Sequence, residues 1–204
     1  TAENCTYGEY SHNDTSHTQT CKFCGYKKAE AHTSELTATA SGNTVTLSKG
    51  CGTAGCGYQT TLGTASFTFP KVSYGQSGNV TCTWDGPAGY YGLIEVVGGS
   101  QSQFDKNADE DVAERSWTLA GLFGSTEVTA GGHKLKVSFF SAAAVWSDEC
   151  ELNFTIDPAP LTDSMVTLDQ TVYTYNGIEQ KPTLTVKQGQ TTLAEGTDYE
   201  VSYT

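Results

Sequence analysis

The sequence predicts an all-β protein made of several small modules, and three observations support this fold class. Glycine is abundant, with 22 residues among 204, while only 17% of residues are charged and one is methionine. Threonine is frequent throughout, which suits short strands better than long helices. Runs of alternating apolar and polar residues, each ending near Gly, Pro, Asn or Asp, recur along the chain. Such runs are typical of half-buried strands joined by turns.

The first 35 residues lack the apolar side chains needed for a hydrophobic core. They contain three of the seven cysteines and three of the four histidines, but very few aliphatic residues. Ordering a chain costs about 1–2 kcal/mol per residue in backbone entropy, which so little burial cannot offset. Because seven is an odd number, the cysteines cannot all pair with one another within the chain. Residues 1–35 are therefore predicted to form a module held together by a metal ion or a disulfide.

Cys21 and Cys24 are the first candidate metal ligands, because with Gly25 they form a C-x-x-C-G motif. In a zinc knuckle the glycine lets backbone amides turn toward the two thiolates. If residues 13–14 form the turn of a β-hairpin, Cys5 lies nearly opposite Cys21. Cys5 is then the third ligand.

The fourth ligand is expected to be His32, because the seven residues that follow Cys24 are enough for a loop to return. His17 lies four residues before Cys21, which is about 13 Å along an extended strand, and is judged too far away. A site closed by four protein ligands has no position for water, so this zinc would stabilise the fold rather than catalyse. A Cys21–Cys24 or Cys5–Cys21 disulfide is the alternative in an oxidising exterior. The predicted zinc ligands are Cys5, Cys21, Cys24 and His32.

Residues 36–62 are predicted to be a hairpin that connects two modules. Residues 44–47 alternate, 50–57 form a glycine-rich turn, and 58–62 return. We expect Cys51 and Cys56 to close the turn with a local disulfide, because a metal there would lack two further ligands.

Residues 63–157 hold enough strand-like runs for an immunoglobulin-like β-sandwich. Cys82 and Cys150 both point toward the same core in this pattern. They form either a disulfide, worth about 4 kcal/mol in a chain-entropy model, or two buried thiols that pack as small hydrophobic groups. The predicted strands are 65–69, 79–84, 92–97, 116–119, 134–139 and 150–156.

Residues 158–204 are predicted to be a second, truncated immunoglobulin-like module. Pro158 and Pro160 remove backbone donors and favour an extended connection, so the domain boundary is expected there. Strand patterns at 172–175, 183–186 and 199–203 amount to half a sandwich, and we expect the chain of the natural protein to continue beyond them.

The N-terminal module resembles the Cys/His repeats of large surface proteins of gut Firmicutes. The residues that carry the resemblance are CTYGEY at 5–10, SHTQTCKFCG at 16–25 and EAHT at 30–33. In those repeats a Cys or His precedes an aromatic-Gly pair, a C-x-x-C-G motif follows, and a final His closes the unit. Many also have a histidine at the position of His17, so the resemblance keeps His17 as a reserve ligand.

The end of the chain is similar to bacterial immunoglobulin-like repeats of the MBG type. This resemblance depends on YTYNG at 173–177 and GTDYEVSY at 196–203. It implies that residues 158–204 belong to a modular protein that is secreted or held at the bacterial cell wall.

Charge and motif content exclude several function classes. The net charge is −12, so the chain lacks the basic surface that binds nucleic acid or anionic lipid. No apolar run approaches the roughly 18 residues needed to insert into a bilayer. No nucleophile or metalloprotease motif occurs, and we expect no enzymatic activity. The acidic segment 105–111 is interpreted as a solvated loop, with a calcium site as the alternative, although it lacks the Gly and Glu of an EF-hand.

The sequence therefore favours a non-enzymatic structural or spacer segment of a secreted or cell-surface modular protein, expected to be monomeric. An adhesin-type binding module is the first alternative, and its partner would be a host glycan or protein. Loops with Tyr90, Tyr91, Trp117 and Trp146 would supply the contact. The second alternative is an accessory region of a cell-wall enzyme.

Overall fold

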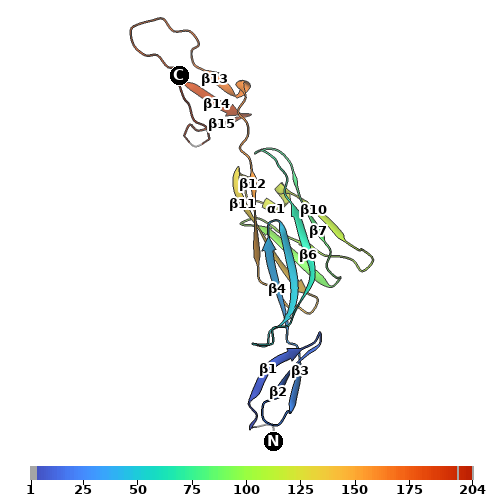
Figure 1. The fold of residues 1–204 in the computed structure, drawn as a ribbon. Helices are drawn as coiled ribbons and strands as arrows, with labels where there is room; N and C mark the ends of the chain where they lie inside the picture. The colour runs from blue at the N-terminus through green and yellow to red at the C-terminus, as the bar shows by residue number, and fades with distance from the viewer. Residues whose placement is uncertain (1–3, 197, 204) are drawn as a thin grey trace. The chain divides into compact units, whose positions relative to one another are not determined.

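The all-β prediction is confirmed by a computed structural model that describes residues 4–196 and 198–203. The chain divides into two compact units, Thr1–Pro158 and Ala159–Thr204. Figure 1 shows antiparallel sheets throughout, joined by turns and loops. Among the described residues, no helix has the length and apolar character required to cross a bilayer.

The N-terminal sheet has three antiparallel strands, β1 (Tyr7–His12), β2 (Ser16–Cys21) and β3 (Lys27–Ala31). The expected turn joins β1 to β2, because the Asn13 side-chain oxygen accepts hydrogen bonds from the backbone amides of Thr15 and Ser16. The side chains of β3 are all exposed. In this sheet, the described residues that are fully buried are His17 and Cys21. A hydrophobic core is absent from it, as the composition predicts.

Two larger sheets form the rest of the first unit, in the strand orders β10-β7-β6-β5-β4 and β12-β11-β8-β9. All neighbouring strands within them are antiparallel. The first sheet consists of β4 (Ser34–Ser41), β5 (Thr44–Cys51), β6 (Gln59–Thr68), β7 (Asn79–Trp84) and β10 (Ala113–Thr118). The second consists of β8 (Tyr90–Val96), β9 (Gln101–Phe104), β11 (Gly131–Ser141) and β12 (Cys150–Ile156).

Side chains from both sheets pack into one hydrophobic core. Alternate residues are buried along β7 and β12, which is the period expected for strands with one buried face. The Trp84 ring on β7 lies 5.2 Å, centroid to centroid, from the Phe139 ring on β11. A short helix, α1 (Leu119–Phe123), adds its buried residues to the same core. Neither α1 nor β9 was predicted from the sequence.

Residues 36–62 were predicted to connect two modules, but in the structure they are part of the larger module that follows. Strands β4 and β5 and the start of β6 belong to the five-stranded sheet. The physical reason is that Leu36, Val45 and Leu47 are buried in the shared core, so this segment has apolar mass to contribute. The boundary of the core lies nearer residue 34 than residue 63.

The second unit contains little buried apolar surface. Its regular elements are a 3₁₀ turn (Asp163–Met165), β13 (Val166–Leu168), β14 (Leu184–Gln188) and β15 (Thr191–Thr192). Strands were predicted at 172–175 and 199–203, and both predictions are wrong, because the structure pairs neither segment in a ladder. Tyr199 makes one isolated bridge with Glu195, and Thr197, within the 196–203 motif, lies outside the described residues.

Candidate metal centres

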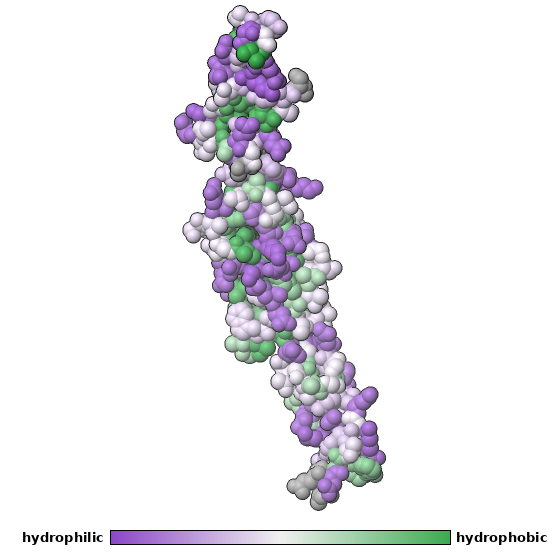
Figure 2. Space-filling view, turned by 90° about the vertical axis from the view of Figure 1, so that its left-hand side faces the viewer, coloured by the Kyte–Doolittle hydropathy of each residue, from purple (hydrophilic) through white to green (hydrophobic). Residues whose placement is uncertain are grey.

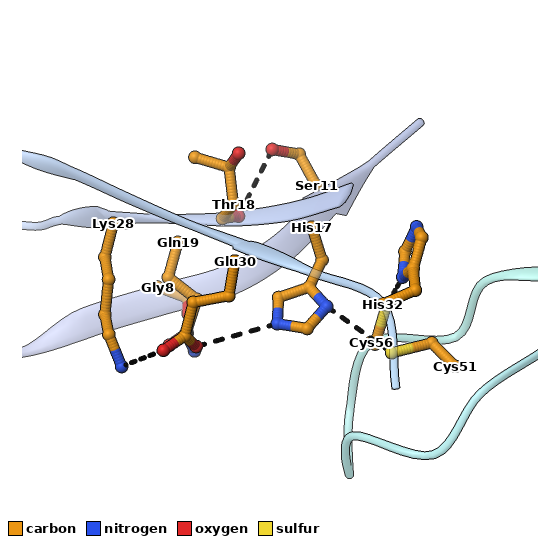
Figure 3. Close-up of polar contacts among 10 residues, drawn as sticks. All are labelled: Gly8, Ser11, His17, Thr18, Gln19, Lys28, Glu30, His32, Cys51 and Cys56. Atoms are coloured by element: carbon orange, nitrogen blue, oxygen red, sulfur yellow. Dashed lines mark hydrogen bonds and ion pairs between the residues drawn. The ribbon is translucent and has the colours of Figure 1, made fainter. Parts of the chain in front are cut away.

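Four metal-ligating side chains meet where the N-terminal sheet contacts the five-stranded sheet. His17 lies on β2, His32 follows β3, Cys51 ends β5, and Cys56 lies in the turn before β6. Their ligand atoms all lie within 4.8 Å of one another. Figure 3 shows the side chains of this His/Cys tetrad converging from the two sheets. The tetrad consists of His17, His32, Cys51 and Cys56.

The distances within the tetrad fit one tetrahedral ion. His17 Nδ1 lies 3.4 Å from Cys51 Sγ, and His32 Nδ1 lies 3.6 Å from Cys56 Sγ. A zinc ion bound at about 2.0 Å to nitrogen and about 2.3 Å to sulfur holds these atoms about 3.5 Å apart. Two imidazoles and two thiols are also a common donor set for structural zinc. The side chains present therefore fit Zn²⁺.

The second nitrogen of His32 is hydrogen-bonded to an oxygen, as in metal-bound histidines, whereas that of His17 faces a carboxylate without a hydrogen bond among the described residues. His32 Nε2 lies 2.7 Å from the Asn13 carbonyl oxygen, to which it donates. His17 Nε2 lies 3.7 Å from a carboxylate oxygen of Glu30, and Figure 3 shows Lys28 holding that carboxylate from the other side. The hydrogen bond from Lys28 lowers the pKa of Glu30, which keeps it charged. Both Nδ1 atoms are thereby directed at the sulfur atoms.

Aromatic rings and burial shield the tetrad from water. The Tyr58 ring stacks on His32 at 4.3 Å between centroids, and the Tyr10 ring meets His17 edge-on at 4.8 Å. His17 is 2% exposed, and Cys51 and Cys56 are also buried. His32 is half-buried.

The electrostatics at Cys51 favour the thiolate that a metal requires. Burial by itself raises the pKa of this thiol, but hydrogen bonds from Thr53, followed by those from His32 and Cys56, outweigh it. The pKa of Cys51 falls from 9.0 to about 5 as a result. A thiolate is the form of cysteine that binds metal.

A second cluster, the thiol trio, consists of Cys5, Cys21 and Cys24. Their sulfur atoms lie within 4.8 Å of one another, and those of Cys5 and Cys24 are 3.7 Å apart. The turn depends on Gly25, which has a φ of 70° and donates its amide to the Cys21 carbonyl. Hydrogen bonding to Cys5, with backbone amides of Cys24 and Phe23, lowers the pKa of Cys21 to about 7.

The predicted ligand set is divided between these two clusters. Cys5, Cys21 and Cys24 lie together as expected, but His32 belongs to the tetrad and must be removed from their site. The reason is that β3 pairs with β2 along its length, so the chain runs away from Cys24 to the opposite end of the sheet. His17, kept only in reserve, is also a tetrad member. The sequence interpretation assigned no metal to Cys51 and Cys56.

The disulfide expected between Cys51 and Cys56 is absent, and for Cys82 and Cys150 the alternative of two free thiols holds, because all seven cysteines lie in the described chain as free thiols. Cys51 and Cys56 instead face the two histidines. Cys82 lies on β7 and Cys150 on β12, in different sheets.

Two carboxylates of the acidic segment 105–111 face the same cation, Arg115. Arg115 lies 3.2 Å from a Glu110 carboxylate oxygen and 4.0 Å from one of Asp105. Lys106 donates to the Asp111 carbonyl. These contacts favour the solvated loop over the calcium alternative.

Searches against protein-family models, curated proteins and solved structures found no match to this chain. The chemistry of the tetrad and the thiol trio is therefore what points to function.

Proposed function

We propose that this chain is a non-enzymatic structural segment of a modular protein, and that Zn²⁺ bound by the tetrad fastens its N-terminal sheet to the adjoining β-sandwich. One observation carries the proposal. His17 comes from the three-stranded sheet, His32 lies in the link between β3 and β4, and Cys51 and Cys56 come from the end of β5 and the turn that follows it. An ion held by all four joins the two sheets directly.

A structural role follows from the coordination and from the packing. Four protein donors fill a tetrahedral zinc and leave no position for a reacting water. Tyr10 and Tyr58 cover the imidazoles. Because the three-stranded sheet has little apolar burial of its own, the free energy of metal binding is largely available as folding free energy.

Metal analysis of the whole chain tests this role. We expect wild-type protein to retain zinc after gel filtration, and its chelation to make residues 7–31 sensitive to limited proteolysis while the β-sandwich stays resistant. His17→Ala is expected to produce the same sensitivity without chelator. His12→Ala is the matched control, because His12 is an exposed histidine of the same sheet. Equal protease resistance of the chelated and zinc-loaded proteins would overturn the proposal.

A secreted or cell-wall location and a monomeric state complete the proposal. The acidic composition and the resemblance to surface-protein repeats support the location. Figure 2 presents a face on which hydrophilic and hydrophobic residues are interspersed, and such a surface is compatible with a monomer. The β-sandwich is proposed to be of the immunoglobulin-like class and the second unit a truncated repeat of similar kind.

A row of stacked aromatic rings favours an adhesin role as the second candidate. Trp146 stacks on Phe140 at 4.7 Å, and Phe140 stacks on Tyr91 at 5.0 Å, all on β8, β11 and the loop that follows. Trp146 is 54% exposed, and exposed aromatic faces stack on sugar rings or on protein side chains. Glycan-array binding that is lost in Trp146→Ala, but retained in Phe23→Ala, whose ring is even more exposed at 82%, would support this candidate. No binding above background by the wild-type chain would reject it.

A further inference from the structure

The thiol trio and the tetrad are built on the same local scaffold. In each, one donor precedes the first strand of an antiparallel hairpin: Cys5 precedes β1, and His32 precedes β4. The next donor is the last residue of the second strand, Cys21 on β2 or Cys51 on β5. The final one, Cys24 or Cys56, lies in the following turn.

The hydrogen bonds around the two sites match position by position. The amide after the strand-end cysteine donates to the carbonyl after the first donor, in the pairs Lys22 to Thr6 and Gly52 to Thr33. The strand registers also match, with Tyr7 opposite Cys21 and Ser34 opposite Cys51. The amides of the two strand-end cysteines donate to the equivalent carbonyls of Tyr26 and Tyr58.

One donor of the tetrad has no counterpart in the trio. His17 comes from outside the β4–β5 hairpin, on a separate sheet that packs against its end. Within the described residues, the group of Cys5, Cys21 and Cys24 has no fourth metal donor, whether histidine, cysteine or carboxylate. The trio therefore has the three donors that a hairpin supplies and lacks the one that a neighbour supplies.

The trio is also arranged to hold an ion with one position open to solvent. The 3.7 Å between the sulfur atoms of Cys5 and Cys24 is close to the roughly 3.8 Å that separates two thiolates on one tetrahedral zinc. Cys21 is buried, whereas Cys24 and the Phe23 side chain beside it are exposed. An incoming ligand can reach the metal from that side.

We propose that Cys5, Cys21 and Cys24 form a second zinc site, independent of the tetrad, whose fourth ligand is a histidine imidazole supplied by another structural unit. The site then acts as a joint at which a neighbouring module docks, in the way that the β1–β3 sheet docks on the β4–β5 hairpin. The imidazole belongs either to another segment of a longer chain or to a second molecule. This inference stands apart from the structural role of the tetrad.

Cobalt substitution tests the site, because Co²⁺ occupies tetrahedral zinc sites and has visible d–d bands that report its ligands. We expect about two Co²⁺ per wild-type chain and about one in each single-site variant. In Cys56→Ser, whose substitution lies outside the N-terminal hairpin and keeps Cys5, Cys21 and Cys24, the remaining Co²⁺ should have sulfur-rich bands that shift saturably when free imidazole is added. In Cys24→Ser, the remaining tetrad bands should not respond to imidazole.

Two outcomes would overturn the proposal: absence of bound Co²⁺ in Cys56→Ser, or bands in that variant that imidazole leaves unchanged. His17→Ala provides a second test, since it also removes a tetrad donor and leaves the trio. Sedimentation of the zinc-loaded protein identifies the source of the imidazole. A dimer that Cys24→Ser abolishes assigns it to a second copy of this chain, and a monomer assigns it to a different module. Loss of the tetrad bands in Cys24→Ser would show that the two sites are not independent and would also count against the proposal.

Discussion

The Nδ1 atom of His17 lies 3.4 Å from the sulfur of Cys51, although the two residues are 34 positions apart in the chain. The contact crosses from the three-stranded sheet to the five-stranded sheet. Considered alone, His17 is a histidine within a strand and Cys51 is a cysteine at the end of a strand, and neither position by itself indicates a metal site. Together with His32 and Cys56 they give the N-terminal module an anchor that its own apolar content does not provide.

We predict that His17→Ala will remove about one zinc per chain and destabilise the N-terminal sheet more than His12→Ala, because a buried ligand is lost in the first case only. Zinc content and protease mapping measure the two effects. The sequence alone led to the opposite expectation, in which His17 was dispensable. If His17→Ala retains its full zinc content, His17 is not a ligand and the prediction is wrong.

Glu30→Gln is predicted to weaken zinc binding at the tetrad by roughly 10–100-fold, the usual effect of removing a second-shell partner. Its carboxylate lies 3.7 Å from His17 Nε2, and removing the charge leaves the imidazole less well oriented. Competition with a chromophoric chelator measures the affinity. Glu9→Gln, an exposed carboxylate on the same sheet, is the control and should bind zinc as tightly as wild type.

Leu47→Ala is predicted to destabilise the first unit by about 2–5 kcal/mol, as is usual for a buried leucine. Leu47 is fully buried on β5, within the segment that the sequence suggested was only a connector. Thr39→Ala, exposed on the neighbouring strand, should change stability by no more than about 0.5 kcal/mol. Denaturant unfolding measures the free energy of unfolding of both variants. If Leu47→Ala unfolds at the same denaturant concentration as wild type, the segment is only a connector and the prediction is wrong.

Cys82 is predicted to resist alkylation in the folded protein. Burial raises the pKa of this thiol to about 12, so only about one molecule in 10⁴ has the reactive thiolate at pH 8. The pKa shifts upward because burial in the folded protein disfavours the charged thiolate. Cys24 is exposed and should react first in metal-free protein, with zinc protecting it. Mass spectrometry of iodoacetamide-treated protein would contradict this if Cys82 were modified as fast as Cys24.

Residues 159–204 expressed alone are predicted to show no cooperative unfolding transition. Val186 is the fully buried apolar residue among the described part of this unit, while Val172, Tyr175 and Ile178 are more than 70% exposed. So little burial cannot offset chain entropy in a unit of this size. Differential scanning calorimetry of the isolated segment is the measurement, and a sharp endotherm would refute it.

Several features were determined by local sequence. Strands β7 and β12 were predicted with their correct bounds, because alternation with period two is a property of neighbouring residues. The hairpin turn expected at residues 13–14 and the grouping of Cys5, Cys21 and Cys24 also follow from short-range spacing. The strands of the second unit were predicted less well, because alternation alone does not form a strand when no partner strand pairs with it.

The assignment of donors to sites was decided only by tertiary structure. His32 lies eight residues from Cys24 in sequence, but its Nδ1 lies 3.6 Å from Cys56 Sγ. The reason is that β3 pairs with β2 and leads the chain back to the end of the sheet that packs on β5. Cys51 and Cys56 are two donors short of a metal site when only their own loop is considered. A coordination sphere is about 4 Å across, so its members are chosen by strand register and by the packing of one sheet on another, neither of which the spacing along the chain contains.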